Sequence, residues 1–347
     1  MKGLTLKKSG LKTSGLLKPS SNTPSLTPHP SILQSIAAAA LVILFAVTAI
    51  PLAQAQKMAG PNRPLGVPEG YVITPFGYFH PSCVRGLASG ETVLADGRVQ
   101  HNDGTEDAIA PLCSYPHYTA HGDLVTRRQS SNEPPAIGHS WIEDGSTTTS
   151  TSYGKLTASW VVPPAPTTND GQTVYLFPGM VDLQTDETII QPVLGWNSFL
   201  GEVWTIASWN CCPSGTANYS KPVQVNVGDT INGTIKSTCT PGVESCSKWD
   251  IGTQDATLGK STTLANTPSE GQTFNWAQSG ALEVYDIAQC SDYPPNGSIT
   301  FSKVALYDYN LVRIANPGWS ITDYYGGLSP QCNYGGKTTA NSVTLDY

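Results

Sequence analysis

Histidine is missing from most of this 347-residue chain. All six histidines lie between His29 and His139, so none occurs from Trp141 onward. A serine–histidine–aspartate triad or a cysteine–histidine pair confined to the C-terminal part is therefore excluded. That part also has no Gly-x-Ser-x-Gly nucleophile motif and no glycine-rich phosphate or dinucleotide loop. Any catalysis there must depend on carboxylates and amides.

Charged residues are scarce, at 13% of the chain, and 26 acids outnumber 19 bases. This acidic balance argues against a nucleic-acid partner. The residues that form long helices are sparse beyond residue 60, whereas 33 glycines and 27 prolines favour short strands joined by turns. We therefore expect an all-β protein.

The N-terminal residues have the pattern of an export signal. Five lysines precede an apolar stretch from Ile36 to Ile50, and the small-residue sequence Ala53-Gln54-Ala55 follows it. This order predicts a secretory signal peptide over residues 1–55. An uncleaved signal anchor is the alternative, although the apolar stretch is short for a membrane span. We expect a secreted protein with no membrane partner once the signal is removed.

All eight cysteines follow the signal, so disulfides are expected. We predict a bridge between Cys83 and Cys113. The other six cysteines permit 15 connectivities. Adjacent Cys211 and Cys212 are expected to bridge to different partners, because a bridge between neighbours strains the peptide between them.

One spacing resembles a metal site, Cys113-x3-His117-x3-His121. Ligands at this spacing need a helix, and Pro116 lies inside the segment. We therefore expect surface histidines beside a disulfide, with no metal and no cofactor.

The chain divides into four segments by composition. After the signal, residues 56–130 form a small β-rich unit that we interpret as a propeptide, and residues 131–150 resemble an exposed linker. Arg127-Arg128, just before the linker, is either a processing site or part of an ordinary loop. Residues 151–347 carry regularly spaced apolar segments, which predict a two-sheet antiparallel β-sandwich of jelly-roll or concanavalin-like kind. The expected strands are Lys155–Val162, Thr173–Phe177, Thr188–Leu194, Glu202–Trp209, Val223–Val227, Thr230–Ser237, Gln272–Trp276, Ala281–Ile287 and Ser298–Tyr307.

Two polar side chains stand out within apolar strand sequence, Gln191 and Glu283. Burying either one is costly unless it is hydrogen-bonded. The pattern alone favours two residues on a solvated face. If both face the same side of one sheet, they can pair across it.

Six short segments occur in an order and spacing found in one protein family. They are Gly154–Pro164, Thr173–Gly179, Thr188–Gln191, Ala207–Pro213, Val227–Ile231 and Ala281–Val284. With this series, residues 150–310 resemble the glutamic peptidases, the secreted eqolisin family with a two-sheet β-sandwich. Gln191 then matches the position of the catalytic glutamine, and Glu283 that of the catalytic glutamate.

The resemblance implies a monomeric acid endopeptidase that acts on polypeptides without a cofactor. Glu283 would activate water and pass a proton to the leaving amine, and the Gln191 amide would stabilise the oxyanion. Phe177, Trp196 and Trp209 either line the substrate cleft or pack in the core.

The sequence departs from the family pattern in places. Pro192 directly follows the glutamine, Asn210 and two cysteines stand where the family has an acid and aromatics, and residues 56–130 do not resemble the usual propeptide. The layout is also similar to the neprosin peptidases, which use two glutamates. Gln191 in place of a second acid favours the Glu/Gln pair.

Two other functions fit the composition. One is a non-catalytic lectin or adhesion sandwich whose aromatic residues stack on sugars. The other is a glycosidase with paired acids such as Glu202 and Glu283, whose carboxyls must lie about 5–5.5 Å apart in a retaining enzyme or about 6.5–9.5 Å apart in an inverting one. The discriminating feature is whether Gln191 and Glu283 lie within hydrogen-bond reach on one open face.

Overall fold

The computed structural model describes the ranges 56–60, 63–108, 113–125, 141–183, 189–199, 201–212, 215–324 and 330–347. All of them belong to one compact unit, residues 51–347, and the predicted signal lies outside them. Strands dominate these residues, and no described helix has the length and apolar character needed to cross a membrane.

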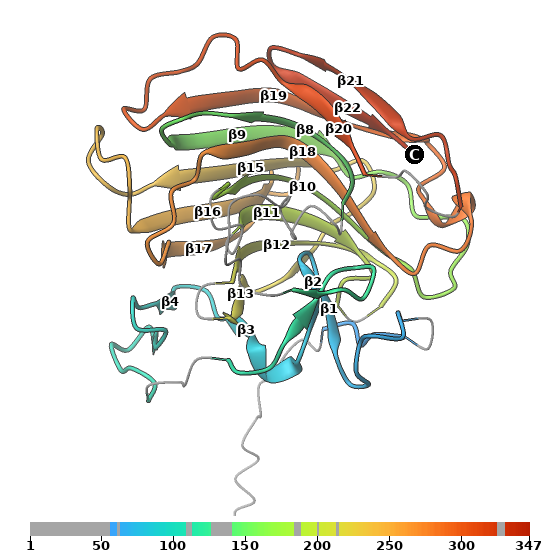
Figure 1. Cartoon of the computed structure of the whole chain (residues 1–347), viewed down its shortest axis with the longest axis horizontal. Helices are drawn as coiled ribbons and strands as arrows, with labels where there is room; N and C mark the ends of the chain where they lie inside the picture. Colours follow the sequence, from blue (N-terminus) through green and yellow to red (C-terminus); the bar gives the residue numbers. More distant parts are fainter. Residues whose placement is uncertain are drawn as a thin grey trace, which may run out of the picture. The chain divides into compact units, whose positions relative to one another are not determined.

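Two large sheets pack face to face, as the β-sandwich prediction requires (Figure 1). The seven-stranded sheet has the order β17, β16, β15, β9, β19, β22, β21. Its bounds in that order are Lys260–Pro268, Lys248–Asp255, Thr230–Ser237, Tyr153–Val161, Ser298–Asp308, Ser342–Asp346 and Gly335–Thr339. Buried and partly exposed residues alternate along β15, so this sheet has one face on the core and one toward solvent.

The nine-stranded sheet has the order β20, β8, β18, β10, β11, β12, β13, β3, and β14 also pairs with β12. Its bounds in that order are Ser320–Asp323, Trp141–Thr148, Trp276–Tyr285, Thr173–Val181, Ile189–Trp196, Trp204–Cys211, Ala217–Ser220 and Val84–Leu87, with Val223–Gln224 for β14. Every residue of β10, β11, β12 and β18 is buried. These strands must therefore be covered on both faces.

The second face is covered by N-terminal residues, which Figure 1 shows in blue to green. A four-stranded sheet has the order β1, β2, β6, β7, with bounds Val72–Thr74, Gly77–Phe79, His117–Tyr118 and Leu124–Val125. A further pair joins β4 (Thr92–Val93) to β5 (Val99–Gln100). Strand β3 pairs in parallel with β13, and Leu87, Val93 and Val99 belong to the sandwich core. The residues predicted as a propeptide thus supply part of the sandwich itself.

The predicted linker ends earlier than expected. Trp141–Thr148, within the predicted linker 131–150, forms β8 and pairs with β18. The first ten residues of the linker and the Arg127-Arg128 pair lie outside the described residues. The expected strand Gln272–Trp276 is also wrong, because β18 begins only at Trp276.

The disulfides partly follow the prediction. Cys83 bridges Cys113 as expected, with further bridges between Cys239 and Cys246 and between Cys290 and Cys332. The expectation that Cys211 and Cys212 have different partners is wrong, because they bridge each other.

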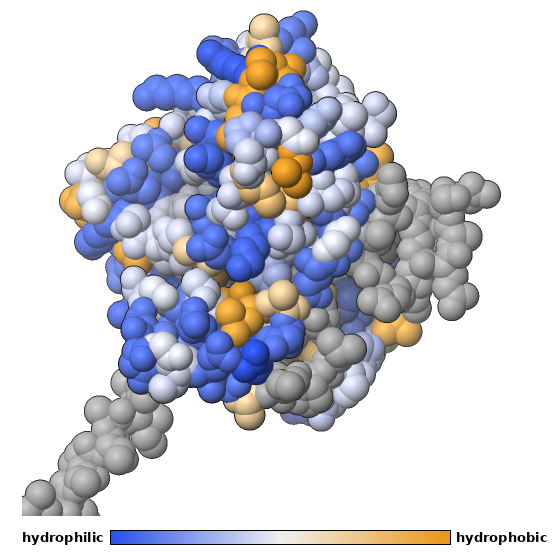
Figure 2. All heavy atoms as spheres, turned by 90° about the vertical axis from the view of Figure 1, so that its left-hand side faces the viewer, coloured by the Kyte–Doolittle hydropathy of each residue, from blue (hydrophilic) through white to orange (hydrophobic). Residues whose placement is uncertain are grey.

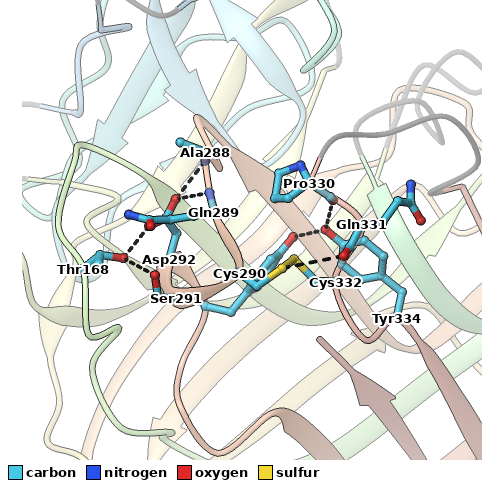
Figure 3. Close-up of a disulfide and its surroundings, with 11 residues drawn as sticks. Thr168, Ala288, Gln289, Cys290, Ser291, Asp292, Pro330, Gln331, Cys332 and Tyr334 are labelled. Atoms are coloured by element: carbon cyan, nitrogen blue, oxygen red, sulfur yellow. Dashed lines mark hydrogen bonds between the residues drawn. A yellow bond between two sulfur atoms is a disulfide. The ribbon is translucent and has the colours of Figure 1, made fainter.

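The Cys290–Cys332 bridge lies at the turn that follows β18 (Figure 3). In this turn the buried carboxylate of Asp292 accepts the backbone N–H groups of Ala288 and Gln289, at 2.8 and 3.0 Å, and the Thr168 hydroxyl. The turn and the bridge hold the end of the strand that carries Glu283.

The surface seen in Figure 2 is mainly hydrophilic, and its apolar side chains form small separate groups. The large aromatic side chains lie instead in two buried clusters, one between the sheets and one under the N-terminal residues. Aromatic burial on both sides of one sheet is therefore the main apolar feature of this fold.

We expect Leu87→Ala on β3 to lower the free energy of unfolding of the whole sandwich by about 2–4 kcal/mol. Leu87 is 3% exposed and packs in the inter-sheet core. Urea unfolding followed by tryptophan fluorescence measures this, since all eight tryptophans lie between Trp141 and Trp319. Leu124→Ala on exposed β7 is the matched control, with an expected change below about 0.5 kcal/mol. An unchanged transition for Leu87→Ala would mean that the N-terminal residues are only an appendage.

Candidate functional site

The face of the nine-stranded sheet that looks away from the seven-stranded sheet is called the outer face here. Side chains alternate along a strand, so Gln191 shares a face with Val193, and Glu283 shares one with Tyr285. Val193 and Tyr285 both belong to the cluster under the N-terminal residues. Gln191 and Glu283 therefore lie on the same outer face, but that face is covered.

Gln191 is fully buried and is hydrogen-bonded to the N-terminal cover. Its Nε2 donates to the backbone carbonyl oxygen of Pro75 over 3.1 Å. Pro75 and Phe76 form the turn between β1 and β2, and the Phe76 ring packs edge-on against Trp209, the residue opposite Gln191 on β12. The Gln191 amide thus already holds the carbonyl of a peptide chain.

Glu283 is fully buried among tyrosines. The Tyr285 hydroxyl donates to its Oε1, and the Tyr285 ring packs edge-on against Tyr175 and against Tyr78 of the cover. Burial raises the pKa of Glu283 well above its ordinary value, and the Tyr285 hydroxyl and the Trp141 side chain offset only part of this. Burial therefore favours the neutral form of the Glu283 carboxyl over its carboxylate.

The structure does not bring Gln191 and Glu283 into contact. Strand β10 lies between their strands and pairs Tyr175 with Glu283 and Met180 with Ile190, so that the continued register brings Gly179 opposite Gln191. Four residues of a strand span roughly 13 Å, so the two side chains are offset along β10 by that amount. Each side chain bonds instead to a different neighbour.

Gln278 lies across β10 from Gln191, and the sequence-based prediction missed it. Gln278 pairs with Gly179 from the β18 side, in line with Gln191 on the β11 side. An amide within the apolar sequence Trp276-Ala277-Gln278 is the same signal that singled out Gln191, and it would have found this residue.

The three predicted substrate-lining aromatics divide between two sites. Phe177 and Trp209 lie on the outer face, where Trp209 stacks with Phe199. Trp196 lies on the opposite side of the sheet, in the inter-sheet core beside Trp204. Only Phe177 and Trp209 are therefore placed near Gln191.

The paired acids of a glycosidase are not found at the predicted positions. Glu202 is exposed in the turn before β12, three strands away from the buried Glu283. Two other acids are buried on β8. Burial raises the pKa of Asp144 to about 7 and that of Glu143 to about 8, with hydrogen bonds from Tyr324 to Asp144 and from Gly335 to Glu143 offsetting part of the rise.

In the segment Cys113-x3-His117-x3-His121, the cysteine takes part in a disulfide. Cys113 is bridged to Cys83, and the ring of His117 stacks on Phe79. Within the described ranges, no group of three or more metal-ligating side chains comes together.

Some solved structures of known proteins are similar to this chain. No family model matches the sequence, and no curated protein matches it. Scytalido-glutamic peptidase with a transition state analog inhibitor is similar in structure, with 13% identity and a TM-score of 0.45 over 60% of this chain and 98% of that one. SCP-B, an eqolisin peptidase in complex with the tripeptide Ala-Ile-His, has 14% identity and a TM-score of 0.42 over the same shares. Aspergilloglutamic peptidase from Aspergillus niger has 15% identity and a TM-score of 0.38 over 50% of this chain and 98% of that one.

The buried acids stabilise the fold more in acid than at neutral pH, against a smaller opposite contribution from His117, whose pKa burial lowers to about 4. A carboxyl whose pKa is raised by folding binds more protons in the folded state, so its contribution is complete below the unfolded pKa and is lost as the pH rises toward the folded pKa. For Asp144 this window runs from about 4 to about 7. We expect the free energy of unfolding to fall by a few kcal/mol across it.

The measurement is urea unfolding between pH 4 and 8. Asp144→Asn should flatten the pH dependence, because the amide stays neutral throughout. Glu244→Gln, at an exposed acid, is the matched control and should leave the slope unchanged. A wild-type protein that gains stability from pH 4 to 7 would contradict the prediction.

Proposed function

We propose that this protein is a secreted peptidase that acts at the outer face of the nine-stranded sheet, and that the form described is closed by its own N-terminal residues. One observation carries the proposal: the Gln191 amide donates to the carbonyl of Pro75 in a buried turn of the same chain. The outer face therefore has the polar group and the aromatic surroundings to hold an extended polypeptide.

In this proposal the Pro75 carbonyl stands in for the carbonyl of a substrate. An amide N–H aimed at that oxygen stabilises the negative charge that develops there during attack by water. Phe76 packs against Trp209 as a substrate side chain would. A substrate chain would replace the turn residues and make the same contacts.

Glu283 is the acid we propose, in a role that its burial dictates. A neutral carboxyl donates its proton to the leaving nitrogen, and the carboxylate that remains takes up the proton that the attacking water loses, which restores the acid. Because the two residues are offset along β10 by roughly 13 Å, the proton would pass between Glu283 and the leaving group through water. Glu283 then acts through the water on the leaving group and does not share a hydrogen bond with Gln191.

Opening the site requires the β1–β2 turn to move, and it does not require residues 56–130 to leave. Pro75 and Phe76 cover Gln191, and Tyr78 covers Tyr285. Strand β3 in contrast pairs with β13, and its Leu87 is part of the core. We propose that the turn is displaced while β3 stays in the sheet, so that only part of the predicted propeptide is inhibitory.

The test is digestion of a reduced and alkylated protein at pH 2–7. We expect Gln191→Ala to lower the cleavage rate by about 10²–10³, because one oxyanion donor is lost. Glu283→Gln should abolish cleavage, because the amide cannot supply the proton. Gln224→Ala, at an exposed glutamine of the same sheet, is the control and should cleave like the wild type.

Unchanged cleavage by a folded Gln191→Ala or Glu283→Gln protein would rule out this mechanism. The circular dichroism and tryptophan fluorescence of each variant are compared with the wild type first, so that a loss of rate is not a loss of fold.

A second candidate is a polypeptide-binding sandwich without hydrolysis. The observation that favours it is the position of Gln278, a carboxamide, across Gly179 from Gln191, where no carboxyl of the described residues lies. Such a protein would bind an unfolded polypeptide at all pH values from 2 to 7 and leave it intact. Binding without any cleavage in the assay above would select this candidate.

A further inference from the structure

Gln278 combines complete burial with unused hydrogen-bonding atoms. It is 0% exposed, and neither its Nε2 nor its Oε1 has a hydrogen-bond partner among the described residues. The Oε1 of Gln191 is in the same condition. Burying an amide without partners costs about 1–3 kcal/mol, so such groups are uncommon in folded proteins. Methionine would fill the same volume without this cost.

Gly179 makes the space between the two glutamines. A Cβ on Gly179 would lie 3.0 Å from the Oε1 of Gln278 and 3.1 Å from the Cδ1 of Ile189. The Gln278 side chain therefore extends over the glycine, and the register next to the Met180–Ile190 pair brings Gln191 to the other side of the same residue. The two carboxamides flank one backbone position that has no side chain.

We propose that Gln278 and Gln191 form a carboxamide pair that binds the backbone of an extended polypeptide over Gly179. Gln191 donates to a carbonyl oxygen of the bound chain, and Gln278 accepts an N–H and donates to a second carbonyl. The ligand is the peptide backbone, independent of side-chain sequence and charge. This inference rests on the proposed function, because it assumes that the outer face opens to a chain supplied in trans.

The turn that closes the outer face uses the carboxamide pair incompletely. Pro75 offers a carbonyl oxygen to Gln191, but a proline has no backbone N–H. Of the four polar atoms of the two side chains, only the Nε2 of Gln191 is bonded. A chain with an N–H at this position makes additional hydrogen bonds, so it can compete with the covering turn.

The experiment measures binding without turnover. Full-length protein carrying Glu283→Gln, which cannot supply the proton, is titrated into fluorescently labelled, reduced and alkylated lysozyme, and anisotropy gives Kd. Gln278→Met, added to this background, should raise Kd about five- to tenfold, as expected for the loss of hydrogen bonds of ordinary strength. The same substitution should leave the protein at least as stable in urea, because an unpartnered buried amide is removed.

Gly179→Ala is the second variant and keeps both glutamines. Its added methyl group lies between the carboxamides, and Kd should rise by a similar factor. Gly252→Ala on β16 of the other sheet is the matched control, because a Cβ there meets only Thr263 at 3.8 Å. Its Kd should equal that of the Glu283→Gln parent.

The outcomes separate this inference from the proposed peptidase. Weaker binding by both Gln278→Met and Gly179→Ala, with no cleavage by the wild type, would support the carboxamide pair and reject the peptidase. Cleavage by the wild type with unchanged Kd and KM in Gln278→Met would reject the carboxamide pair and keep the peptidase. Failure of every variant and of the parent to bind the labelled chain would also overturn the inference.

Discussion

The hydrogen bond from Gln191 to Pro75 joins the nine-stranded sheet to the N-terminal residues that cover it. It ties the middle of the nine-stranded sheet to the turn that covers it, at a place where both partners are buried. Once this face is covered, the central strands have two apolar faces, and every residue on them is shielded from water. The aromatic contacts of Phe76 and Tyr78 extend the same cover over the neighbouring strands.

Because the nine-stranded sheet is covered on both faces, the pKa values of its buried acids are raised. On a sheet with one solvated face, a glutamate among apolar residues points to water and stays ionised. Here Glu283 and Asp144 have no access to water, so both keep their protons far above the pH at which free carboxyls lose them. The cover thus decides which protonation state the candidate site has.

The sequence predicts the sandwich well because its strands are short, apolar and separated by turns. Thr230–Ser237 is reproduced as β15 with the same bounds. Strand β8 is missed because Glu143, Asp144 and Ser146 give it a polar sequence, although all three are buried. The assumption that polar residues are exposed is wrong for Glu143 and Asp144, because burial favours their neutral forms.

Sequence patterns likewise identify part of the candidate site and miss the rest. Gln191 and Glu283 are found by their polar character within apolar strands, but the pattern favours a solvated face, whereas both lie on a covered one. Their separation depends on the register of β10 against two neighbours, including a bulge in the β10–β18 pairing, which no local pattern encodes. Gln278 occupies the place next to Gln191 for the same reason.

These protonation states oppose a simple acid activation. Opening the cover would let water reach Glu283 and lower its pKa, so the open form binds fewer protons than the closed form. Acid therefore favours the closed form, while it also keeps Glu283 in the protonated state that proton donation needs. Under the proposed function, the covered site cannot be opened by titrating its own buried acid. The cover would then have to be displaced by cleavage of the covering segment or by competition from a bound polypeptide, and the proline in the covering turn makes that competition easier.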